Sequence, residues 1–464
     1  MKSHVLQRSV SFRLSAMVGV CILLSTFQAV GQRIGEITRG KPTVSLPKSS
    51  TDNLPVRYGL GFPVQLGPNS AGLFCNLRVV GPKRSDYEDG CDMLVFDDLG
   101  NVGQADPTAI SRNEKENDVE TGKLRFIEKF PAIGGFWPLG AKRPDGSAHP
   151  GEGRGFAICQ ALSLIGSGRE LTWGMFSLPS TKQYTEIMQL SFDGKRVSVV
   201  KHDLLKNGRK WTTADGWGIV SGGMQAAIPD GSDLLMAVVA ANKTGVARTG
   251  VARFRFADGQ WQPTAFSPVA GGSEPSVVRR ADRSLIFLTR PDDERDGDRG
   301  GKRIVLWASK DGGRTWKQIL CSENERPRTP VSVNATPDGR VFVLANVPGM
   351  TNPSQTMLWW HLDRARLAMW QLADGAATFD PPQPQIIRDC LEEFGPIAKY
   401  RWDVDHPSSG VIRLRDGRWH GVVTYRVRAY SLVEDTQGEL VTQHTGCYVE
   451  EVPSAQPVTP PWRF

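Results

Sequence analysis

The sequence predicts an all-β protein, a six-bladed β-propeller, with five or seven blades as alternatives. Short apolar runs rich in Val, Ile, Phe and Trp alternate with turn-forming Asp-Gly and Pro-containing steps, and helical periodicity is hard to find after the N-terminal segment. Six turn-forming dipeptides have a mean spacing of about 65 residues, which suits four-stranded blades with long loops. These dipeptides are Asp89-Gly90, Gly166-Ser167, Asp230-Gly231, Asp282-Arg283, Asp338-Gly339 and Asp416-Gly417.

The first 31 residues have the pattern of a secretory signal peptide. A basic start precedes an apolar run that extends to Leu24, and Ala29-Val30-Gly31 offers a small-x-small triplet with cleavage before Gln32. The apolar run is too short for a membrane span, and Val20 in place of a small residue before Cys21 argues against lipidation. We therefore expect a secreted or periplasmic protein with no stable membrane insertion after cleavage. An N-terminal anchoring helix is the alternative.

The chain divides into four expected segments. Residues 1–31 are the signal peptide, 32–57 an N-terminal extended segment, 58–452 the propeller and 453–464 a Pro-rich C-terminal tail. Strand–turn–strand units are clearest over residues 219–240, 331–345 and 411–425. We expect pairing of N-terminal and C-terminal strands to close the ring.

Composition limits the classes of partner. The chain has 56 Lys and Arg against 49 Asp and Glu, and the signal peptide holds three of the basic residues, which leaves 53 against 49, or +4. This small excess does not indicate nucleic-acid binding, whereas local basic patches still allow an acidic glycan as partner.

The six cysteines after residue 31 form no CxxC pair and the chain has only seven histidines, so we expect no metal site and no cofactor. Cys75 and Cys91 form either a disulfide or two free thiols. The sequence leaves the oligomeric state open.

One motif favours the propeller over a β-sandwich, in which Asp-Gly turns are also common. Residues 309–316 follow the pattern S-x-D-x-G-x-T-W between two apolar runs. The acidic side chain is expected to cap amides of its own hairpin, the glycine to adopt a conformation that other residues resist, and the tryptophan to cover the blade. The residues with these roles are Ser309, Asp311, Gly313, Thr315 and Trp316.

This motif resembles the Asp-box of sialidase-like β-propellers, and the preceding segment strengthens the resemblance. Glu274-Pro275 begins an apolar run, a turn follows near Asp282, and a second apolar run ends at Arg290. Sialidases have Asn-Glu-Pro, a strand, an Asp-Gly turn, a strand and an arginine in one blade. The resemblance extends over about residues 215–430 and implies an exo-glycosidase acting on an acidic, sialic-acid-like sugar. It gives Glu274 the role of assisting the nucleophile, and Arg290 that of gripping the sugar carboxylate through two donors.

Strand direction places further candidates beside this pair. The Asp-Gly turn and the Asp-box hairpin lie at one end of a blade, so the start of the first strand and the end of the second lie at the other. Glu274 and Arg290 are therefore expected to meet at the mouth of the central channel, away from residues 309–316. The same reasoning adds His406 and Tyr425 as candidate catalytic residues, and Arg328, Arg426 and Asn346 as candidate substrate-binding residues.

The sequence departs from the sialidase pattern at the nucleophile. Sialidases usually have Tyr-Ser-Asp before an apolar strand of a late blade, and here His406-Pro407-Ser408 has serine in the position of the tyrosine. Tyr425 is a candidate substitute, but strand alternation puts it and Arg426 on opposite faces, and blade packing is the competing role. His406 is a candidate general acid or base, or simply bonds its neighbours. The early Arg-Ile-Pro motif is missing, and the acid/base aspartate has no clear counterpart.

Three functions follow as hypotheses. The first is a sialidase-like exo-glycosidase, based on Glu274 and Arg290. The second is a carbohydrate-binding propeller without catalysis, favoured by the missing tyrosine. The third is a polysaccharide lyase, in which His406 or Tyr425 moves protons while arginines neutralise a uronate.

Overall fold

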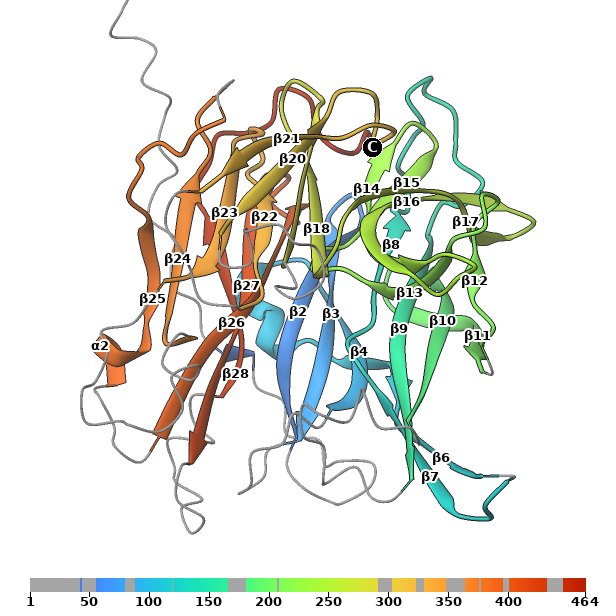
Figure 1. The fold of residues 1–464 in the computed structure, drawn as a ribbon. Helices are drawn as coiled ribbons and strands as arrows, with labels where there is room; N and C mark the ends of the chain where they lie inside the picture. Colours follow the sequence, from blue (N-terminus) through green and yellow to red (C-terminus); the bar gives the residue numbers. More distant parts are fainter. Residues whose placement is uncertain are drawn as a thin grey trace, which may run out of the picture.

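The chain folds into six antiparallel β-sheets arranged in a ring, a six-bladed β-propeller (Figure 1), which confirms six blades and excludes five or seven. No helix in the described part of the chain is long and apolar enough to cross a membrane. The computed structural model describes residues 42–43, 56–79, 88–118, 120–165, 181–206, 208–290, 303–322, 329–347, 364–374, 377–394, 400–431 and 445–464.

Each blade has three or more consecutive antiparallel strands, because β-branched and aromatic residues alternate with turns. Blade 1 contains β2 (Val56–Gly67), β3 (Ser70–Val79), β4 (Glu88–Phe96) and β5 (Pro107–Arg112); blade 2 contains β6 (Glu114–Asn117), β7 (Leu124–Lys129), β8 (Ile133–Trp137), β9 (Arg154–Ile165), β10 (Lys182–Phe192) and β11 (Val197–Leu205). Blade 3 contains β12 (Trp211–Thr212), β13 (Gly218–Gly222), β14 (Ile228–Asp230), β15 (Asp233–Ala241), β16 (Ala247–Ala257) and β17 (Gln260–Ala270).

The remaining blades are simpler. Blade 4 contains β18 (Ser273–Arg279), β19 (Leu285–Arg290), β20 (Val305–Ser309) and β21 (Lys317–Cys321); blade 5 contains β22 (Ser332–Ala335), β23 (Val341–Asn346), β24 (Arg366–Gln371) and β25 (Gln385–Asp389), followed by the short helix α2 (Cys390–Phe394). Blade 6 contains β26 (Tyr400–Arg413), β27 (Trp419–Ser431), β28 (Gly446–Val452) and β1 (Pro42–Thr43).

Four of the six expected turns are confirmed. The turns at Asp282-Arg283, Asp338-Gly339 and Asp416-Gly417 each join the first two strands of a blade, and the turn at Asp230-Gly231 joins the short strand β14 to β15. Gly166-Ser167 lies outside the described residues.

The expected turn at Asp89-Gly90 is wrong, because both residues lie within strand β4. Gly90 has φ of 103°, and a Cβ at this position would lie 2.2 Å from the carbonyl oxygen of Ser111 on β5. The glycine is therefore required by a close approach between strands and not by a chain reversal. Pro68-Asn69 forms the first turn of blade 1.

The ring is closed as expected by pairing of the two ends of the chain. Strand β1 pairs antiparallel with β28, with Pro42 opposite Tyr448 and Thr43 opposite Cys447. The C-terminal tail makes a second connection, because Gln456 bonds both the N–H and the carbonyl of Trp419 in blade 6, at 2.8 and 3.0 Å. Near its end, the carbonyl of Arg463 accepts from the N–H of Lys142, in the loop between β8 and β9 of blade 2, at 2.7 Å.

Interfaces between blades form the apolar core. Blades 5 and 6 enclose a cluster that contains Phe342, Leu367, Val423, Tyr425 and Tyr448.

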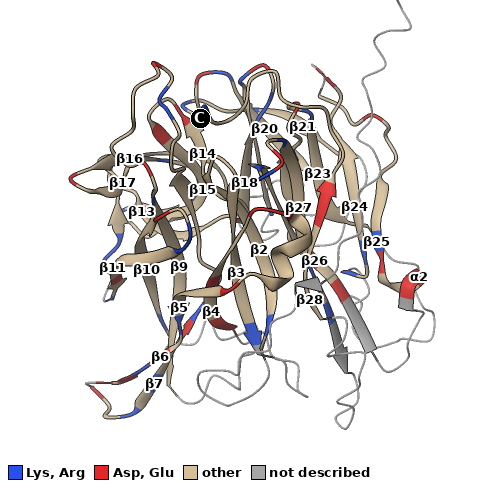
Figure 2. Ribbon diagram, turned by 180° about the vertical axis from the view of Figure 1, so that it is seen from behind, with Lys and Arg blue, Asp and Glu red and all other residues tan. Residues whose placement is uncertain are grey.

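All six cysteines in the described part of the chain are free thiols, and five of them are buried, so no Cys75–Cys91 disulfide is present. Basic and acidic side chains are interspersed along strands and loops, as Figure 2 shows, which fits the small net charge.

A polar bridge spans the centre of the ring. Nε2 of Gln225, between β13 and β14, lies 3.2 Å from Oδ1 of Asn334 on β22 and 3.1 Å from Oγ of Ser409 on β26. The side chain of Gln225 is buried, so it joins blade 3 to blades 5 and 6 across the axis. The centre of the propeller is therefore filled by side chains at this level.

Candidate functional site at the mouth end

Two ends of the propeller are distinguished by strand direction. The hairpin end contains residues 309–316, and in blade 4 Leu285 pairs with Ser309 near that end. The mouth end is opposite, where Arg290 pairs with Ser273. In Figure 1 the hairpin β20–β21 lies at the top and the hairpin β6–β7 at the bottom, which is the mouth end.

Glu274 and Arg290 meet at the mouth end. Nη1 of Arg290 donates to Oε2 of Glu274 at 3.2 Å, and the two side chains are 17% and 26% exposed. Both positions follow from the short hairpin β18–β19, which returns the chain to the level at which it started. The sequence therefore brings together the two residues that the sialidase resemblance singled out.

His406 faces this pair from blade 6. Its Nε2 lies 3.7 Å from Oε1 of Glu274, although blade 5 separates blades 4 and 6 along the chain. Both residues are followed by proline, and both have a left-handed backbone, with φ of 53° at each. Sterics disfavour this conformation for residues other than glycine, and each outlier sits at a bulge in the pairing of its strand. Such outliers are enriched at functional sites.

Asp405 organises the floor of the site. Its carboxylate is fully buried and accepts from Nε and Nη2 of Arg426, both at 2.8 Å. Nη1 of Arg364 donates to Oδ2 of Asp405 at 2.7 Å, and Nδ1 of His406 lies 2.8 Å from its Oδ1. One carboxylate therefore fixes two guanidinium groups and one imidazole. We call Glu274, Arg290, Arg364, Asp405, His406 and Arg426 the mouth cluster.

Burial and charge set the protonation states. Burial raises the pKa of Asp405, but the charges of Arg426 and His406 outweigh it and hold the pKa well below its usual range. Burial likewise opposes ionisation of Glu274, but Arg290 and His406 lower its pKa below the ordinary value. Burial is the main reason why the pKa of His406 falls to about 4, with Asp405 opposing and Arg426 adding to the shift. At neutral pH both carboxylates are ionised and the imidazole is neutral.

The remaining expected site residues lie around or away from this cluster. Asn346 is buried, and its Nδ2 donates to the carbonyls of Val404, at 2.7 Å, and Arg366, at 2.8 Å, so it fixes the backbone beside Asp405. Arg426 is only 1% exposed and forms part of the floor. Arg328 lies outside the described residues.

Tyr425 points away from the mouth cluster. It is fully buried between blades 5 and 6, where its hydroxyl donates to Glu450 and its ring stacks on Tyr448 at 5.7 Å. Burial raises the pKa of Tyr425 well above its ordinary value, and Glu450 raises it further. The alternation along β27 that separates Tyr425 from Arg426 is therefore present, and Tyr425 lies outside the mouth cluster. Ser408 is also fully buried.

The 309–316 hairpin is held by its own side chains. Oδ1 of Asp311 accepts from the N–H groups of Arg314 and Thr315, both at 3.0 Å, and from Oγ of Ser309 at 2.8 Å. Gly313 has φ of 88°, and Nε1 of Trp316 donates to its carbonyl at 3.1 Å. Hydrogen bonds from Thr315 and Ser309 hold the pKa of Asp311 below its usual range. These contacts are structural and lie at the end opposite the mouth cluster.

Sequence reasoning missed two members of the cluster. Arg364 precedes the short strand β24 without a recognisable motif, so only the fold brings it to Asp405. Asp405 itself directly precedes His406, and a buried acid next to a histidine and opposite an arginine was the available signal.

Two other groups of polar residues lie outside the mouth cluster. Glu114, Glu186 and His202 have ligand atoms within 4.8 Å of one another, but Nζ of the buried Lys129 lies 2.9 Å from Glu114 and 2.5 Å from Glu186. The ammonium group therefore already occupies the place of a cation, and the set does not fit a metal.

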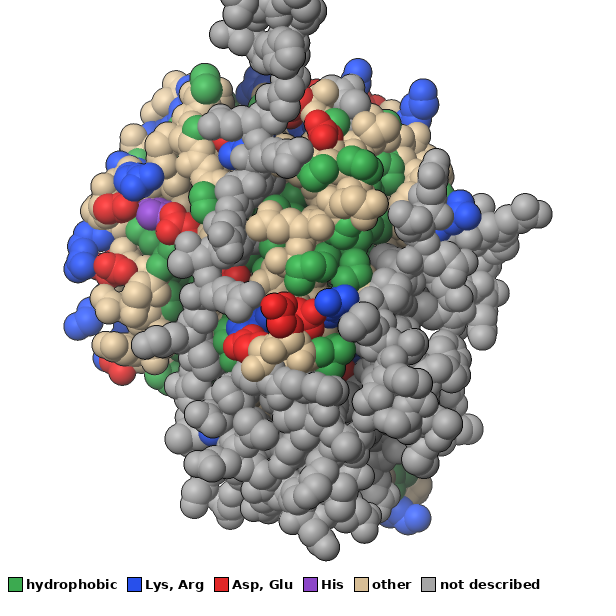
Figure 3. All heavy atoms as spheres, turned by 90° about the vertical axis from the view of Figure 1, so that its left-hand side faces the viewer, with side chains coloured by type: hydrophobic (Ala, Val, Ile, Leu, Met, Phe, Trp, Pro, Cys, Tyr) green, Lys and Arg blue, Asp and Glu red, His purple; other side chains and the backbone are tan. Residues whose placement is uncertain are grey.

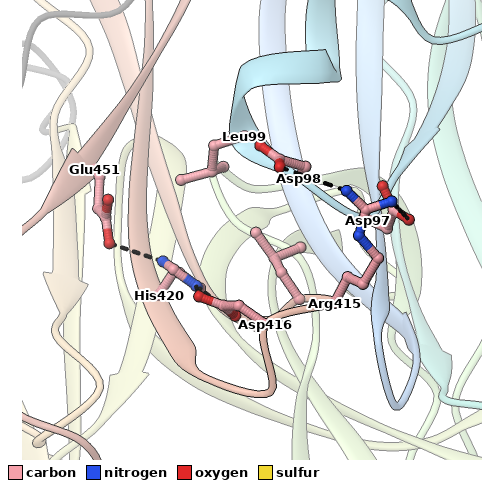
Figure 4. Close-up of a pocket in the computed structure, with 8 residues that line it drawn as sticks. Asp97, Asp98, Leu99, Arg415, Asp416, His420 and Glu451 are labelled. Carbon is pink, nitrogen blue, oxygen red and sulfur yellow. Dashed lines mark hydrogen bonds and ion pairs between the residues drawn. The ribbon is translucent and has the colours of Figure 1, made fainter.

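The second group lines a pocket of about 350 Å³ at the hairpin end, between blades 6 and 1 (Figure 4). Its polar groups pair with one another, because His420 contacts Glu451 at 2.7 Å and Asp416 at 3.1 Å. Arg415 reaches toward Asp97, at 3.4 Å. The face of the molecule drawn in Figure 3 has acidic, basic and hydrophobic side chains side by side. Among the described residues, that face therefore presents no uniform charge.

Comparisons with known proteins support the fold. No protein-family model and no curated protein matches the chain. The structure is similar to Trypanosoma rangeli sialidase in complex with the inhibitor DANA, with 13% identity and a TM-score of 0.51 over 90% of this chain and 60% of that chain. The same sialidase in complex with 2,3-difluorosialic acid, a covalent intermediate, gives 13% identity and a TM-score of 0.50 over 89% and 58% of the two chains.

An α-L-arabinofuranosidase from Fusarium graminearum, in complex with an iminosugar inhibitor, gives 11% identity and a TM-score of 0.46 over 90% of this chain and 98% of that chain. The chain spans about 60% of the length of the sialidase that it matches. At this identity the likeness to the sialidase shows a shared propeller fold.

Proposed function

We propose that this propeller acts on carbohydrate and binds the carboxylate of an acidic sugar at the mouth cluster. The observation that carries the proposal is the presence of three arginines at the mouth end. The guanidinium groups of Arg290, Arg364 and Arg426 lie there beside the carboxylates of Glu274 and Asp405, and His406 is neutral. A guanidinium group binds a carboxylate through two parallel donors, so an acidic sugar matches both the charge and the geometry.

The accessible part of the cluster is suited to a ligand. Glu274, Arg290, His406 and Arg364 are 26%, 17%, 15% and 10% exposed and form a rim above the buried Asp405. Among the described residues, Arg364 donates only through Nη1, so its other donors remain for a ligand. Partial burial strengthens such contacts, because the surrounding protein has a lower effective dielectric constant than water.

The fold likeness makes sialic acid the first ligand to test. The related sialidase was solved with a difluorosialic acid, and the chain resembles sialidases at Glu274 and Arg290. Export through residues 1–31 belongs to the same proposal, since extracellular and periplasmic proteins meet such glycans.

Hydrolysis is a second candidate function, favoured by the ionised Glu274 and the neutral His406 facing each other at 3.7 Å. A tyrosine-dependent double displacement has no support among the described residues, because Tyr425 is buried elsewhere and Ser408 has the position of the nucleophile. The lyase hypothesis has less support than hydrolysis, because the negative charge of Glu274 beside His406 would repel the carbanion formed from a uronate.

Calorimetric titration tests the proposal. D-Glucuronic acid and D-glucose differ by one carboxylate, and N-acetylneuraminic acid adds the sialic acid class. We expect each acid to bind at least 10-fold more tightly than glucose, which corresponds to about 1.4 kcal/mol. We also expect the difference to shrink in 0.5 M salt and to disappear in Arg364→Ala. Equal affinity for acid and neutral sugar would contradict the proposal.

A further inference from the structure

His406 accepts a hydrogen bond from Arg426 at Nδ1. Nη2 of Arg426 lies 3.2 Å from Nδ1, and the same guanidinium group donates to Asp405 through Nε and Nη2, both at 2.8 Å. A guanidinium group has only donors, so Nδ1 offers it a lone pair. The positive charge of Arg426 also offsets the repulsion between this lone pair and the Asp405 carboxylate. Because the pKa of His406 is about 4, the neutral ring holds one proton, and that proton is on Nε2.

Nε2 of His406 and Oε1 of Glu274 are therefore a donor and an acceptor that face each other across a gap. They lie 3.7 Å apart, which is too long for a hydrogen bond between them. Oε2 of Glu274 is bound by Arg290, whereas no hydrogen bond to Oε1 or from Nε2 is present among the described residues. The two side chains are 26% and 15% exposed, so a ligand at the mouth end can reach the gap.

A hydroxyl group fits this gap. Its oxygen can lie about 2.8 Å from both atoms, because two such distances form a triangle with the 3.7 Å base. The hydroxyl donates its proton to Oε1 and accepts the proton of Nε2, so both protein groups are satisfied. A sugar hydroxyl also reproduces both hydrogen bonds of any solvent molecule that it displaces there, whereas a methylene or ether group does not.

The backbone fixes the direction of both protein groups. Glu274 and His406 each have φ of 53°, at bulges of β18 and β26. This conformation costs free energy for residues other than glycine, and such strain is enriched at sites that clamp a ligand. Side chains that are already held in place lose little conformational freedom when they bind a hydroxyl.

We propose that Glu274 and His406 bind the ring hydroxyl that neighbours the carboxylate of a uronic acid. This inference rests on the proposed binding of an acidic sugar and narrows its substrate class. Oε1 and Oε2 belong to one carboxylate, so the bound hydroxyl lies next to the guanidinium group of Arg290, which is proposed to bind the sugar carboxylate. The sugar must therefore have a hydroxyl close to its carboxylate.

The two acidic sugars named above differ in this property. In D-glucuronic acid the 4-hydroxyl is on the ring carbon next to the one that bears the carboxylate. In N-acetylneuraminic acid the corresponding ring carbon is a methylene group, which can neither donate to Oε1 nor accept from Nε2. The gap between Glu274 and His406 therefore selects the uronic acid.

Calorimetric titration with D-glucuronic acid and its 4-deoxy derivative tests the inference. Hydrogen bonds to charged groups are stronger than those between neutral groups, so we expect loss of the 4-hydroxyl to weaken binding about 10-fold or more. The 2-deoxy derivative is the matched ligand, and its loss of affinity should be smaller. N-acetylneuraminic acid should bind more weakly than D-glucuronic acid. Equal losses for the two deoxy derivatives would overturn the inference.

Two variants assign the contact to its residues. In Glu274→Gln the amide oxygen must face Arg290, which turns the NH2 group into the gap and leaves the proton of the hydroxyl without its acceptor. His406→Phe removes the donor. We expect the 4-hydroxyl to contribute only a few-fold to binding in either variant. Glu451→Gln is the matched control, because Glu451 also contacts a histidine, at 2.7 Å, but lies at the hairpin end. It should keep the full effect, and melting temperatures check that each variant is folded.

The tautomer of His406 provides a measurement on the wild type itself. Long-range proton–nitrogen correlation spectra of the 15N-histidine-labelled protein show which ring nitrogen of each of the seven histidines bears a proton. The signals of His406 are those that disappear in His406→Phe or, if that variant does not fold, in His406→Asn. We expect the proton on Nε2. A neutral ring with its proton on Nδ1 would overturn the inference.

The outcomes separate the two proposals. If neither acid binds to the wild type, the proposed function fails together with the inference. If D-glucuronic acid binds more tightly than glucose but its 4-deoxy derivative binds equally well, only the inference fails. Binding of N-acetylneuraminic acid alone would have the same meaning. A full 4-hydroxyl effect that persists in both Glu274→Gln and His406→Phe would also overturn the inference, because other groups would then bind that hydroxyl.

Discussion

Glu274 and His406 adopt the same rare conformation at equivalent places in two blades. Each is followed by proline and then serine, and each has φ of 53° at a bulge in the first long strand of its blade. A left-handed residue other than glycine costs on the order of 1–3 kcal/mol. The ion pairs and packing of the cluster offset this cost, and the result is a fixed direction for two side chains.

Arg290→Lys should weaken binding of the acidic sugar about 10-fold and leave folding intact. Lysine keeps the charge but loses the planar pair of donors, and hydrogen bonds to charged groups contribute about 1.5–3 kcal/mol. Calorimetry with D-glucuronic and N-acetylneuraminic acids measures the change. Arg253→Lys in blade 3 is a control, because that arginine also pairs with carboxylates but lies far from the cluster in the chain. Unchanged affinity in Arg290→Lys would remove Arg290 from the binding site.

Tyr425→Phe separates packing from catalysis. The hydroxyl of Tyr425 donates to Glu450 inside the interface between blades 5 and 6, so its removal leaves a buried acceptor without that donor. We expect the free energy of unfolding to fall by about 1–3 kcal/mol while sugar binding and any turnover stay unchanged. Denaturant unfolding and kinetics measure the two effects. Loss of turnover in a stable Tyr425→Phe protein would restore this residue as the nucleophile.

Stability should fall as the pH is lowered from about 6.5 to about 4, partly because of His406. Its pKa is about 4 in the folded chain against 6.5 ordinarily, so the unfolded chain binds more protons in this window and acid favours unfolding. The contribution is at most about 3 kcal/mol at 1.36 kcal/mol per pKa unit. Urea unfolding across this range should show a shallower pH dependence in His406→Asn than in the wild type. An equal slope in both proteins would argue that His406 is not a buried neutral group.

At the level of elements, the propeller ring is closed at two separate places. Within the described residues, strand β1 contributes Pro42 and Thr43 to blade 6, whereas the tail connects blade 6 to blade 2 at the hairpin end. Trp462 is buried and packs edge-on against Trp137 at 5.1 Å. The tail therefore adds apolar burial and hydrogen bonds to a short closing strand.

Trp462→Ala should lower the free energy of unfolding by about 3 kcal/mol, the cost of removing a large buried aromatic side chain. Thermal and denaturant unfolding measure the loss. Sugar binding should be unchanged, since the mouth cluster lies at the opposite end. Val458→Ala is the matched control because Val458, in the same tail, is fully exposed. Equal stability of the two variants would show that the tail does not help to close the ring.

The sequence predicted the turns that are determined by the residues that form them. Asp338-Gly339 and Asp416-Gly417 are turns because their residues favour reversal, and the sequence shows this directly. Asp89-Gly90 has the same composition, but glycine is required at position 90 because strand β5 approaches it closely. That requirement comes from a tertiary contact and not from the local sequence. Glu274 and Arg290 could be paired because one hairpin fixes their separation. Arg364 and His406 join the mouth cluster only because the ring brings blades 4, 5 and 6 together. No local sequence pattern predicts this.

At the level of the whole molecule, the ring converts three distant segments into one site. Residues 274–290, 364 and 405–426 belong to blades 4, 5 and 6 and meet at the mouth end. Gln225 bridges the same region of the ring from blade 3, which helps to fix the inner strands relative to one another. A propeller thus positions charged groups from several blades without any of them needing a shared motif in the sequence.

A crystal structure of the protein soaked with N-acetylneuraminic acid and, separately, D-glucuronic acid tests the central claim most directly. We expect the sugar carboxylate of at least one of them within hydrogen-bond distance, about 2.7–3.0 Å, of the guanidinium groups of Arg290 and Arg364, with a ring hydroxyl or water near Glu274 and His406. Soaked crystals of Arg364→Ala should show lower occupancy at the same concentration. A sugar bound at the hairpin-end pocket, or bound elsewhere with Arg290 and Arg364 untouched, would contradict the account.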